Sequence, residues 1–340
     1  MRSLPQDPRL CGASIVFDWS EIDKGPSYGA KEYDFKPIDD AMVPWIAAGK
    51  RVNLLVAGTN ELGPNDTATP SWVLKSVPTV TCRNPGGNSA AGPPTPVYWN
   101  PGYENPWRAF IRKVLQTYGS NAKVGYVRFG LGAGAEDFPQ HGADGNCFGV
   151  WHEKYGLSAK FWATFSGNLT RYIARTAAAS HATVQPMVAL NSFDDPAAPY
   201  DVATYVAGVA ARNGVGFGTE NLGCCGSGSI VQPCTSAQYW CAAFTKHAGE
   251  IPLEFQPINY TLQTGLKTPI PTLPQLLRYG LENNAQIFEI YAQDWLTADD
   301  DSWPAYAAYH ARCNRALTRA ATILGIAPAP ASQPHHEFRP

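Results

Sequence analysis

The stretch VGYVRFGLGAGAEDFPQHG (124–142) runs from an apolar segment into a turn built mostly of glycine and alanine. Val124, Tyr126 and Phe129 are typical of a buried β-strand. The glycines that follow allow the backbone to come close to other groups. A glutamate, Glu136, then stands at the tip of the turn. A (β/α)8 barrel places its functional groups where a strand ends and its loop begins, so in such a fold Glu136 would project into the mouth of the barrel.

Six other runs of the same kind occur along the chain, and helix-like stretches separate most of them. The seven strand-like runs are 13–19, 51–58, 124–132, 183–191, 214–222, 252–260 and 286–295. The helix-like stretches are 35–49, 105–119, 158–179, 200–214 and 273–285. Alternation of strands and helices predicts a mainly parallel sheet. Seven repeats favour an α/β fold of the (β/α)8 TIM-barrel type over an open sheet, with the eighth strand irregular or outside these runs.

The chain is predicted to form a single barrel domain over residues 11–326. Residues 1–10 form an N-terminal extension, and the Pro/Ala-rich residues 327–340 form a flexible tail. Two long Gly/Pro/Asn-rich segments, 58–104 and 223–236, each follow a strand, and the alternation resumes after both. We expect both to be binding loops at the C-terminal face of the barrel, held by disulfides.

The composition excludes some classes of partner. The net charge is -2 and only 16% of residues are charged, with no basic patch, so we expect no nucleic-acid partner. No run approaches the roughly 18 apolar residues of a membrane span. The 10 Trp, 16 Tyr and 14 Phe residues either fill a core or offer flat rings to sugars. The oligomeric state is left open.

Eight cysteines lie at positions 11, 82, 147, 224, 225, 234, 241 and 313. Several occur in Gly/Pro-rich loops, which is typical of disulfides in an oxidising compartment. We therefore expect a secreted or periplasmic protein, although the segment that opens with Met1 shows no signal-peptide pattern. Zinc is the alternative for the cysteines of 224–241, but they lack the paired C-x2-C spacing of zinc sites.

Three sets of bridges are expected from these positions. Cys82 and Cys147 lie in long loops on the same barrel face, so we predict a bridge between them. Two short-range bridges are expected within 224–241, with the pairing open. Cys11 and Cys313 can pair only if the last helix returns beside the first strand.

Acidic residues lie in or at the end of several predicted strands. Glu254 stands inside an apolar strand on the same face as Gln256, while Glu220 and Glu289 lie in two other strand-like runs. Charged residues are rarely buried without partners, so these acids and Glu136 predict a carboxylate-lined pocket. Two carboxylates across an aromatic-lined cleft are what glycoside hydrolysis needs.

Three segments of the chain resemble clan A glycoside hydrolases, especially the β-galactosidase-like and xylosidase-like families. FDWSEIDKGPSYGAKEYDFKPIDDAMVPWIAAGKRVNLLVAGTN (17–60) looks like the clan segment W-s-x-I/L-E-P…G…Y-D-F/W-s-x-I-D…a-G-k-x-V-x-L, and SWVL (71–74) looks like the P-x-W that follows it. WNPGYENPWRAFIRKVLQTYGSNAKVGYVRFGLGAGAED (99–137) is similar to the helix and fourth strand that carry the clan's acid/base glutamate. The resemblance covers residues 13 to 139 and implies that the seven runs are barrel strands two to eight.

The resemblance also implies roles for single residues. Glu136 ends strand four, where the clan keeps its acid/base, and Glu254 lies on strand seven, where it keeps its nucleophile. Glu289 and the aromatic residues after it lie on strand eight, where the clan often has an aromatic ring at the sugar site. The chain departs from the clan at Ala135, where an Asn usually contacts the sugar 2-hydroxyl.

These inferences together predict a retaining glycoside hydrolase acting on a polysaccharide or oligosaccharide. Glu136 is predicted to be the general acid/base and Glu254 the nucleophile, with Glu289 as the second candidate for that role. No metal or organic cofactor is expected. The predicted substrate-binding residues are Trp19, Trp99, His141, Trp151, Gln256, Tyr260, Tyr291 and Trp295.

Three alternatives stay open at this point. GAGAEDFP (132–139) is similar to the Gly-rich acid segment of inverting β-amylases, so the enzyme is alternatively an inverting glycosidase. A barrel that binds glycans without cleaving them would account for Ala135. A metal-dependent hydrolase would need His/Asp ligands at strand ends, and none of the seven histidines lies at one.

Overall fold

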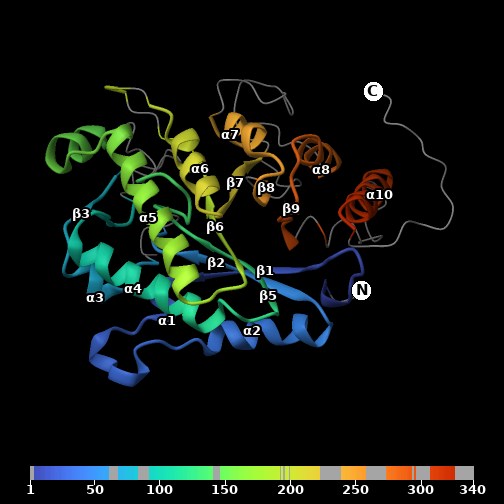
Figure 1. The fold of residues 1–340 in the computed structure, drawn as a ribbon, viewed down its shortest axis with the longest axis horizontal. Helices are drawn as coiled ribbons and strands as arrows, with labels where there is room; N and C mark the ends of the chain where they lie inside the picture. The colour runs from blue at the N-terminus through green and yellow to red at the C-terminus, as the bar shows by residue number, and fades with distance from the viewer. Residues whose placement is uncertain are drawn as a thin grey trace.

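The fold is built on one curled sheet of seven parallel strands (Figure 1). The computed structural model describes residues 4–60, 68–82, 92–140, 146–191, 193, 196–198, 200–222, 239–257, 273–292, 295 and 307–325. The strands, in their order across the sheet, are β1 (Gly12–Asp18), β2 (Arg51–Ala57), β5 (Val124–Phe129), β6 (Gln185–Ala189), β7 (Gly216–Leu222), β8 (Leu253–Pro257) and β9 (Ile287–Phe288). Each corresponds to a predicted run, so all seven predicted strands are confirmed, most of them shortened at one or both ends.

Side chains on the concave face show how far the sheet curls. Arg128 on β5 reaches Glu254 on β8, although β6 and β7 lie between them. Ser14 on β1 donates a hydrogen bond to Glu289 just after β9, although β1 and β9 are the two edges of the sheet. The sheet therefore closes most of the way to a barrel. Among the described residues it has no eighth strand, so the predicted TIM-type fold is confirmed as a seven-stranded, laterally open form.

Helices cover the convex side of the sheet and follow one another around it. They are α2 (Lys36–Ala47), α4 (Pro101–Tyr118), α5 (Ala159–Ala179), α6 (Val202–Arg212), α7 (Tyr239–His247), α8 (Leu273–Glu282) and α10 (Ala307–Ile323). Neighbouring helices pack in sequence order from α4 to α7, and α8 packs against α10. Figure 1 also shows α10 close to the N-terminal segment, whose Leu4 and Leu10 pack against the cluster that contains Leu317.

The helix α4 shows how the local sequence sets an element. Asn100 accepts a hydrogen bond from the Gly102 backbone N–H, and Pro101 occupies the first turn, where its missing N–H costs nothing. The helix therefore begins at Pro101, four residues before the predicted start. Its apolar stripe is buried as the helical spacing predicts, and Trp107 and Phe110 contact Trp19.

The predicted loop over residues 58–104 contains short elements of its own. These are α3 (Ser71–Leu74) and a two-stranded antiparallel pair, β3 (Thr79–Val80) with β4 (Thr95–Pro96). Other short elements are α1 (Trp19–Ile22), single helical turns at Leu4–Gln6 and Pro26–Lys31, and a π-helical turn at Val150–Lys154. Such elements contain too few residues to show a hydrophobic period in the sequence.

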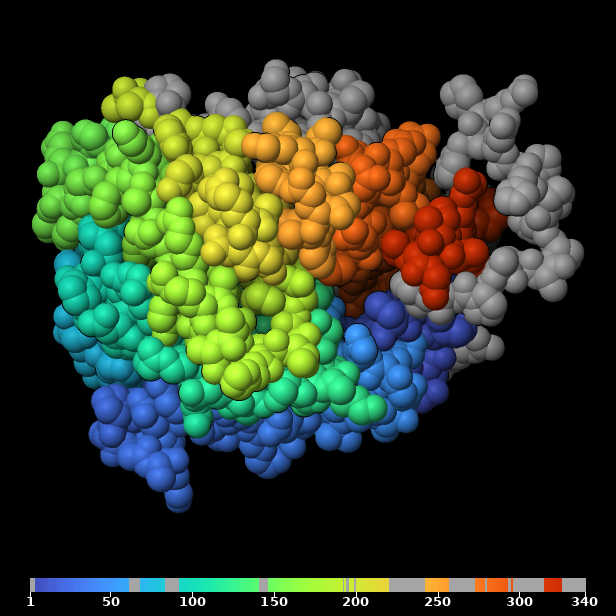
Figure 2. Space-filling view, viewed as in Figure 1, coloured from blue at the N-terminus to red at the C-terminus, as the bar shows by residue number. Residues whose placement is uncertain are grey.

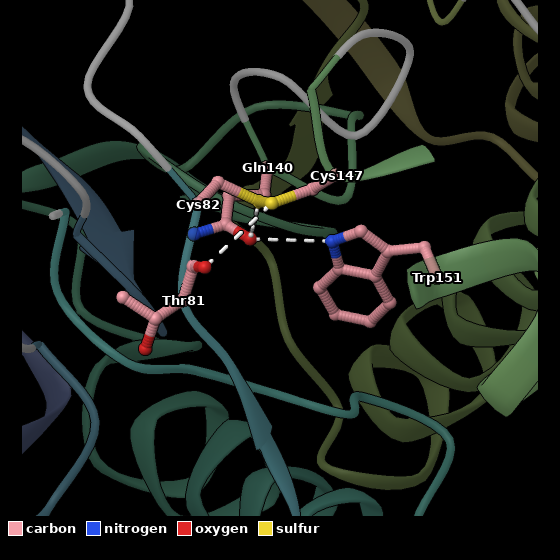
Figure 3. Close-up of a disulfide and its surroundings, with 5 residues drawn as sticks. All are labelled: Thr81, Cys82, Gln140, Cys147 and Trp151. Atoms are coloured by element: carbon pink, nitrogen blue, oxygen red, sulfur yellow. Dashed lines mark hydrogen bonds between the residues drawn. A yellow bond between two sulfur atoms is a disulfide. The ribbon is translucent and has the colours of Figure 1, made fainter. Parts of the chain in front are cut away.

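The predicted disulfide between Cys82 and Cys147 is confirmed (Figure 3). It joins the loop after β2 to the loop after β5, because parallel strands of one sheet end at the same edge. Gln140 lies between the bridge and Trp151: its Oε1 is 2.9 Å from Cys82 Sγ and accepts a hydrogen bond from Trp151 Nε1 at 3.2 Å. A bridged sulfur carries no proton, so only the contact with Trp151 is a hydrogen bond.

The other predicted bridges have different outcomes. Cys11 is exposed and unbridged, so the pairing with Cys313 is absent. The two bridges expected within 224–241 lie outside the residues whose side chains the structure describes. No helix among the described residues is both long and apolar enough to cross a membrane.

Candidate active site

The loop after β5 folds tightly back on itself. The backbone N–H groups of Leu131 and Gly132 both donate to the Glu136 carbonyl, at 3.2 and 2.7 Å. A Cβ at Gly132 would lie 2.1 Å from the Phe138 carbonyl oxygen, so only glycine fits there. Gly134 and Ala135 both have positive φ, at 61° and 64°. This conformation strains an alanine, and it turns the chain so that Glu136 follows at the C-terminal edge of the sheet.

The adjacent residues Glu136 and Asp137 have different environments. Glu136 is 8% exposed, and its Oε2 accepts a hydrogen bond of 2.8 Å from Asn191 Nδ2, just beyond β6. Asp137 is wholly buried, and its Oδ1 accepts a 2.6 Å hydrogen bond from Ser166 on α5. Burial raises the pKa of Asp137 well above its ordinary value, while the hydrogen bonds of Ser166 and Trp162 oppose that shift. Asp137 therefore anchors the loop, while Glu136 is the carboxylate next to Asn191.

A buried arginine lies at the centre of the concave face. Arg128 Nη1 is 2.5 Å from Glu254 Oε1 and 3.5 Å from Glu289 Oε2. Its Nη2 donates a hydrogen bond of 3.3 Å to Gln256 Oε1. The Gln256 amide in turn donates to the Tyr291 hydroxyl at 3.4 Å. The predicted residues Glu254, Gln256, Glu289 and Tyr291 thus meet around one guanidinium group that holds two carboxylates together.

Two hydroxyl groups hold Glu289 from the opposite side. Ser14 on β1 and Tyr126 on β5 both donate hydrogen bonds to Glu289 Oε1. Burial raises the pKa of Tyr126 well above its ordinary value, and the charges of Glu254 and Glu289 raise it further. Tyr126 is therefore a neutral donor throughout the usual pH range, and the orientation of the Glu289 carboxylate is set by groups from two strands, β1 and β5.

A cavity of about 890 Å³ occupies the concave side of the sheet and opens between its two edges. At the C-terminal edge it is lined by Asp18, Asn60, Ala135, Gln256 and Tyr291. Deeper in the sheet, its walls include Ser14, Tyr126, Arg128 and Glu289, whereas neither Glu254 nor Glu136 is among its lining residues. Its outer side is apolar and includes residues of β1, α8 and α10. Figure 2 shows the face on which the red α10 lies beside the blue N-terminal segment, and both segments border this outer side.

Two of the predicted aromatic platforms belong to the core. Trp19 and Trp151 are wholly buried, so neither ring face is open to a sugar. Trp19 contacts the rings of α4 and donates its indole N–H to Asp23. Trp151 lies against Tyr98 and Trp99. These two predictions are wrong because the short helices that carry the rings turn them into the layer between sheet and helices.

The remaining predicted residues are placed as follows. Trp99 is half-buried and contacts Trp151, Phe161 and Phe165. Trp295 borders the cavity but is 4% exposed, and its indole N–H donates to Asp7 at 2.9 Å. His141 and Tyr260 lie outside the described residues, as does the side chain of Glu220. Within the described part of the chain, no group of His, Cys, Asp and Glu is placed to hold a metal ion.

Sequence reasoning missed four residues of the site: Ser14, Tyr126, Arg128 and Asn191. Arg128 carried a usable signal, because a charged residue inside an apolar strand needs a partner, as Glu254 does. The other three are ordinary polar residues in or beside strands, and nothing in their sequence context distinguishes them.

Comparison with known proteins identifies relatives by fold alone. No family model matches the chain, and neither does any curated protein sequence. Among solved structures, the catalytic domain of β-amylase from Paenibacillus polymyxa matches with a TM-score of 0.52 and 11% identity, covering 82% of this chain and 84% of that domain. The β-galactosidase from Bacillus circulans sp. alkalophilus matches with a TM-score of 0.52 and 14% identity. This match covers 84% of this chain but 46% of the β-galactosidase, so the chain spans about half of that protein. The predicted resemblance is thus confirmed at the level of architecture: the chain has the parallel α/β fold of these two glycoside hydrolases.

Proposed function

We propose that this protein is a glycoside hydrolase that acts on an oligosaccharide or polysaccharide, with Glu136 as its proton donor. One observation carries the proposal: a carboxylate with its own amide partner stands at the C-terminal edge of the sheet, and two further carboxylates meet at Arg128 on the concave side, of which Glu289 lines the cavity. Glycoside hydrolysis needs such groups, one to protonate the leaving oxygen and another to attack or to activate water. The fold shared with two glycosidases supports the proposal.

The partner carboxylate belongs to the group around Arg128, and we assign it to Glu289. The sequence alone favoured Glu254, but that side chain is wholly buried, whereas Glu289 lines the cavity. Glu254 pairs with Ile287 across β8 and β9, so Glu289 lies two residues further toward the C-terminal edge. Glu254 then serves as the second charge partner of Arg128.

Retention of anomeric configuration is the proposed outcome, and inversion is the alternative. A retaining enzyme needs its two carboxyl groups about 5–5.5 Å apart, and an inverting enzyme about 6.5–9.5 Å. The similarity of GAGAEDFP (132–139) to inverting β-amylases and the presence of Ala135 favour the alternative. NMR detection of the first-formed anomer decides between them.

The test of the function is release of reducing sugar across a panel of polysaccharides, with Glu136→Gln, Glu289→Gln, Glu254→Gln and a control variant compared with the wild type. Glu136→Gln should lower the hydrolysis of substrates with poor leaving groups by about 10²–10⁴-fold and that of activated aryl glycosides much less. Glu289→Gln should abolish activity on both. Glu153→Gln, at an exposed site, is the control and should change nothing.

Three outcomes would count against the proposal. Equal losses for both substrate classes in Glu136→Gln would remove the assignment of the acid. Full activity of Glu289→Gln with an inactive Glu254→Gln would return the second role to Glu254. If the wild-type protein binds a glycan but hydrolyses none of the substrates, the alternative of a barrel that binds glycans without cleaving them is favoured.

We also propose that the protein works in an oxidising compartment, as a secreted or periplasmic enzyme does. The bridge between Cys82 and Cys147 supports this, because such bridges persist where thiols are not kept reduced. Mass spectrometry of unreduced peptides from the native source should find this bridge, and eight free thiols would contradict both the bridge and the location.

A further inference from the structure

The backbone of Glu136 is held rigidly by its own loop. Its carbonyl accepts hydrogen bonds from Leu131 and Gly132, and its N–H donates to the Ala133 carbonyl at 3.0 Å. Gly134 donates to the Thr59 carbonyl at 2.9 Å, which ties the loop to the chain beyond β2. The Cα of Glu136 is therefore fixed, while the three side-chain torsions beyond it are not fixed by these bonds.

Asn191 is fixed just as firmly from the neighbouring strand. The preceding residue, Leu190, is wholly buried, and its N–H donates to the Gly218 carbonyl on β7 at 2.8 Å. This bond continues the pairing of β6 with β7 one residue past the end of β6. The Asn191 amide therefore projects from a rigid part of the sheet, and its N–H donates to Glu136 Oε2 at 2.8 Å.

We propose that Asn191 is a positioning residue for proton transfer, because its amide fixes the orientation of the Glu136 carboxyl group. The inference rests on the proposed function and adds to it the group that keeps the acid aligned. With Oε2 accepting from Asn191, the transferable proton belongs on Oε1. It moves to the glycosidic oxygen as the bond from the anomeric carbon to that oxygen breaks. A new bond forms from that carbon to Glu289, or to the water that Glu289 activates and deprotonates, the leaving group departs as an alcohol, and Glu136 remains as a carboxylate.

The size of the contribution of Asn191 follows from the effect that alignment of the Glu136 carboxyl group has on the rate of protonation. Holding a long carboxyl side chain in one rotamer costs conformational entropy, and a group that is already ordered avoids this cost during the reaction. Misplacement of a reacting group by about 1 Å can cost about 100-fold in rate. Loss of the Asn191 amide should therefore slow the protonation step by about 10- to 100-fold while binding of the sugar changes little.

The experiment uses two aryl glycosides of the sugar on which the wild type is most active, one with a 2,4-dinitrophenyl and one with a phenyl leaving group. The variants are Asn191→Ala, Asn191→Asp, Glu136→Gln and the double variant Asn191→Ala/Glu136→Gln. Asn191→Asp keeps the shape and leaves no cavity, but it replaces the amide N–H donor by a second carboxyl group, whose charge also acts on Glu136. Gln185→Ala is the matched control, because it removes an amide from the same strand at the opposite end.

The expected result is selective. In Asn191→Ala and Asn191→Asp, kcat/KM for the phenyl glycoside should fall about 10- to 100-fold, and for the dinitrophenyl glycoside less than about 3-fold. The double variant should be no slower than Glu136→Gln, because the amide acts only through the acid. Gln185→Ala should match the wild type on both substrates.

Other outcomes overturn the inference in distinguishable ways. If Asn191→Ala and Asn191→Asp lower kcat/KM equally for the phenyl and the dinitrophenyl glycoside, Asn191 has only a general structural role. The same conclusion follows if the losses of the two single variants add in the double variant. A selective loss in Glu136→Gln alone would refute the role of Asn191 and leave the proposed function standing. No selectivity in any variant would refute both.

Discussion

Replacement of Asp137 by asparagine should make the protein more stable, and increasingly so as the pH rises. Asp137 is wholly buried, and its Oδ2 has no hydrogen-bond partner among the described residues. Burial raises the pKa of this carboxyl group well above its ordinary value. The group is therefore neutral in the folded protein at pH values where the unfolded chain, with an aspartate pKa of about 3.9, is ionised.

The sign of the effect follows from this difference between the two states. Because the folded-state pKa is raised, the contribution of Asp137 to the free energy of unfolding is largest below about pH 3.9. It is lost as the pH rises from there to the folded-state pKa, by about 1.4 kcal/mol for each pH unit. An asparagine does not ionise in either state, and its Oδ1 can still accept the hydrogen bond from Ser166.

Urea denaturation followed by circular dichroism at pH 4.5, 5.5 and 6.5 measures the effect. The difference in the free energy of unfolding between Asp137→Asn and the wild type should shift in favour of the variant as the pH rises, by up to about 1.4 kcal/mol per pH unit while the pH lies below the folded-state pKa of Asp137. Asp40→Asn on α2 is the control, because that carboxylate is exposed and pairs with Lys36. A difference that stays constant across the three pH values would show that Asp137 is ionised in the folded protein.

Three further changes should alter stability. Replacing Cys82 and Cys147 by alanine removes the bridge between two residues 65 positions apart in the sequence. The loss of this constraint on the unfolded chain should lower the free energy of unfolding, measured by urea denaturation, by about 4 kcal/mol. A loss below about 1 kcal/mol would contradict this account. Burial opposes ionisation of Asp7, but hydrogen bonds from Arg9 and Trp295 and the charge of Arg9 outweigh it and lower the pKa of Asp7 to about 2. The stability that ionised Asp7 confers is therefore present above about pH 4 and is lost as the pH falls toward 2. Asp7→Asn should therefore cost about 1–2 kcal/mol at pH 7 and less at pH 2.5, and an equal loss at both pH values would refute this account. Ala135→Gly relieves a positive φ of 64° and should raise the free energy of unfolding by up to about 1 kcal/mol, which a slightly higher thermal midpoint would show. A lower midpoint would show that the alanine is not strained.

The sheet and its loops could be predicted from the sequence because their signals are local. Each strand is an apolar run, and the helices between them carry apolar residues at helical spacing, as α4 does. The bridge from Cys82 to Cys147 could also be predicted, because parallel strands place their following loops at one edge. The lack of an eighth strand among the described residues could not, because it depends on which residues pair with β1 and β9 at the two edges of the sheet.

The candidate site was predictable only in part. The candidate carboxylates could be singled out because acids in apolar strands are unusual. The groups that hold them come from other strands: Asn191 reaches Glu136 from beyond β6, and Ser14 reaches Glu289 across the opening of the sheet. Such pairs depend on how the sheet curls, and this cannot be predicted from the sequence pattern of any single segment. Trp19 and Trp151 were misassigned because an aromatic ring near a strand end has the same sequence context in a core as in a cleft.

The charges around Arg128 are not accounted for by stability alone, and the proposed function gives them a use. A guanidinium and two carboxylates lose most of their hydration on the concave side of the sheet, and the attraction between buried charges often does no more than offset that loss. Apolar side chains of similar volume would commonly hold the strands together as well. The fold nevertheless places Glu254 and Glu289 on one cation and adds Ser14 and Tyr126 as donors to Glu289. Since Glu289 also lines the cavity, this arrangement is what a site that presents an oriented carboxylate to a substrate requires.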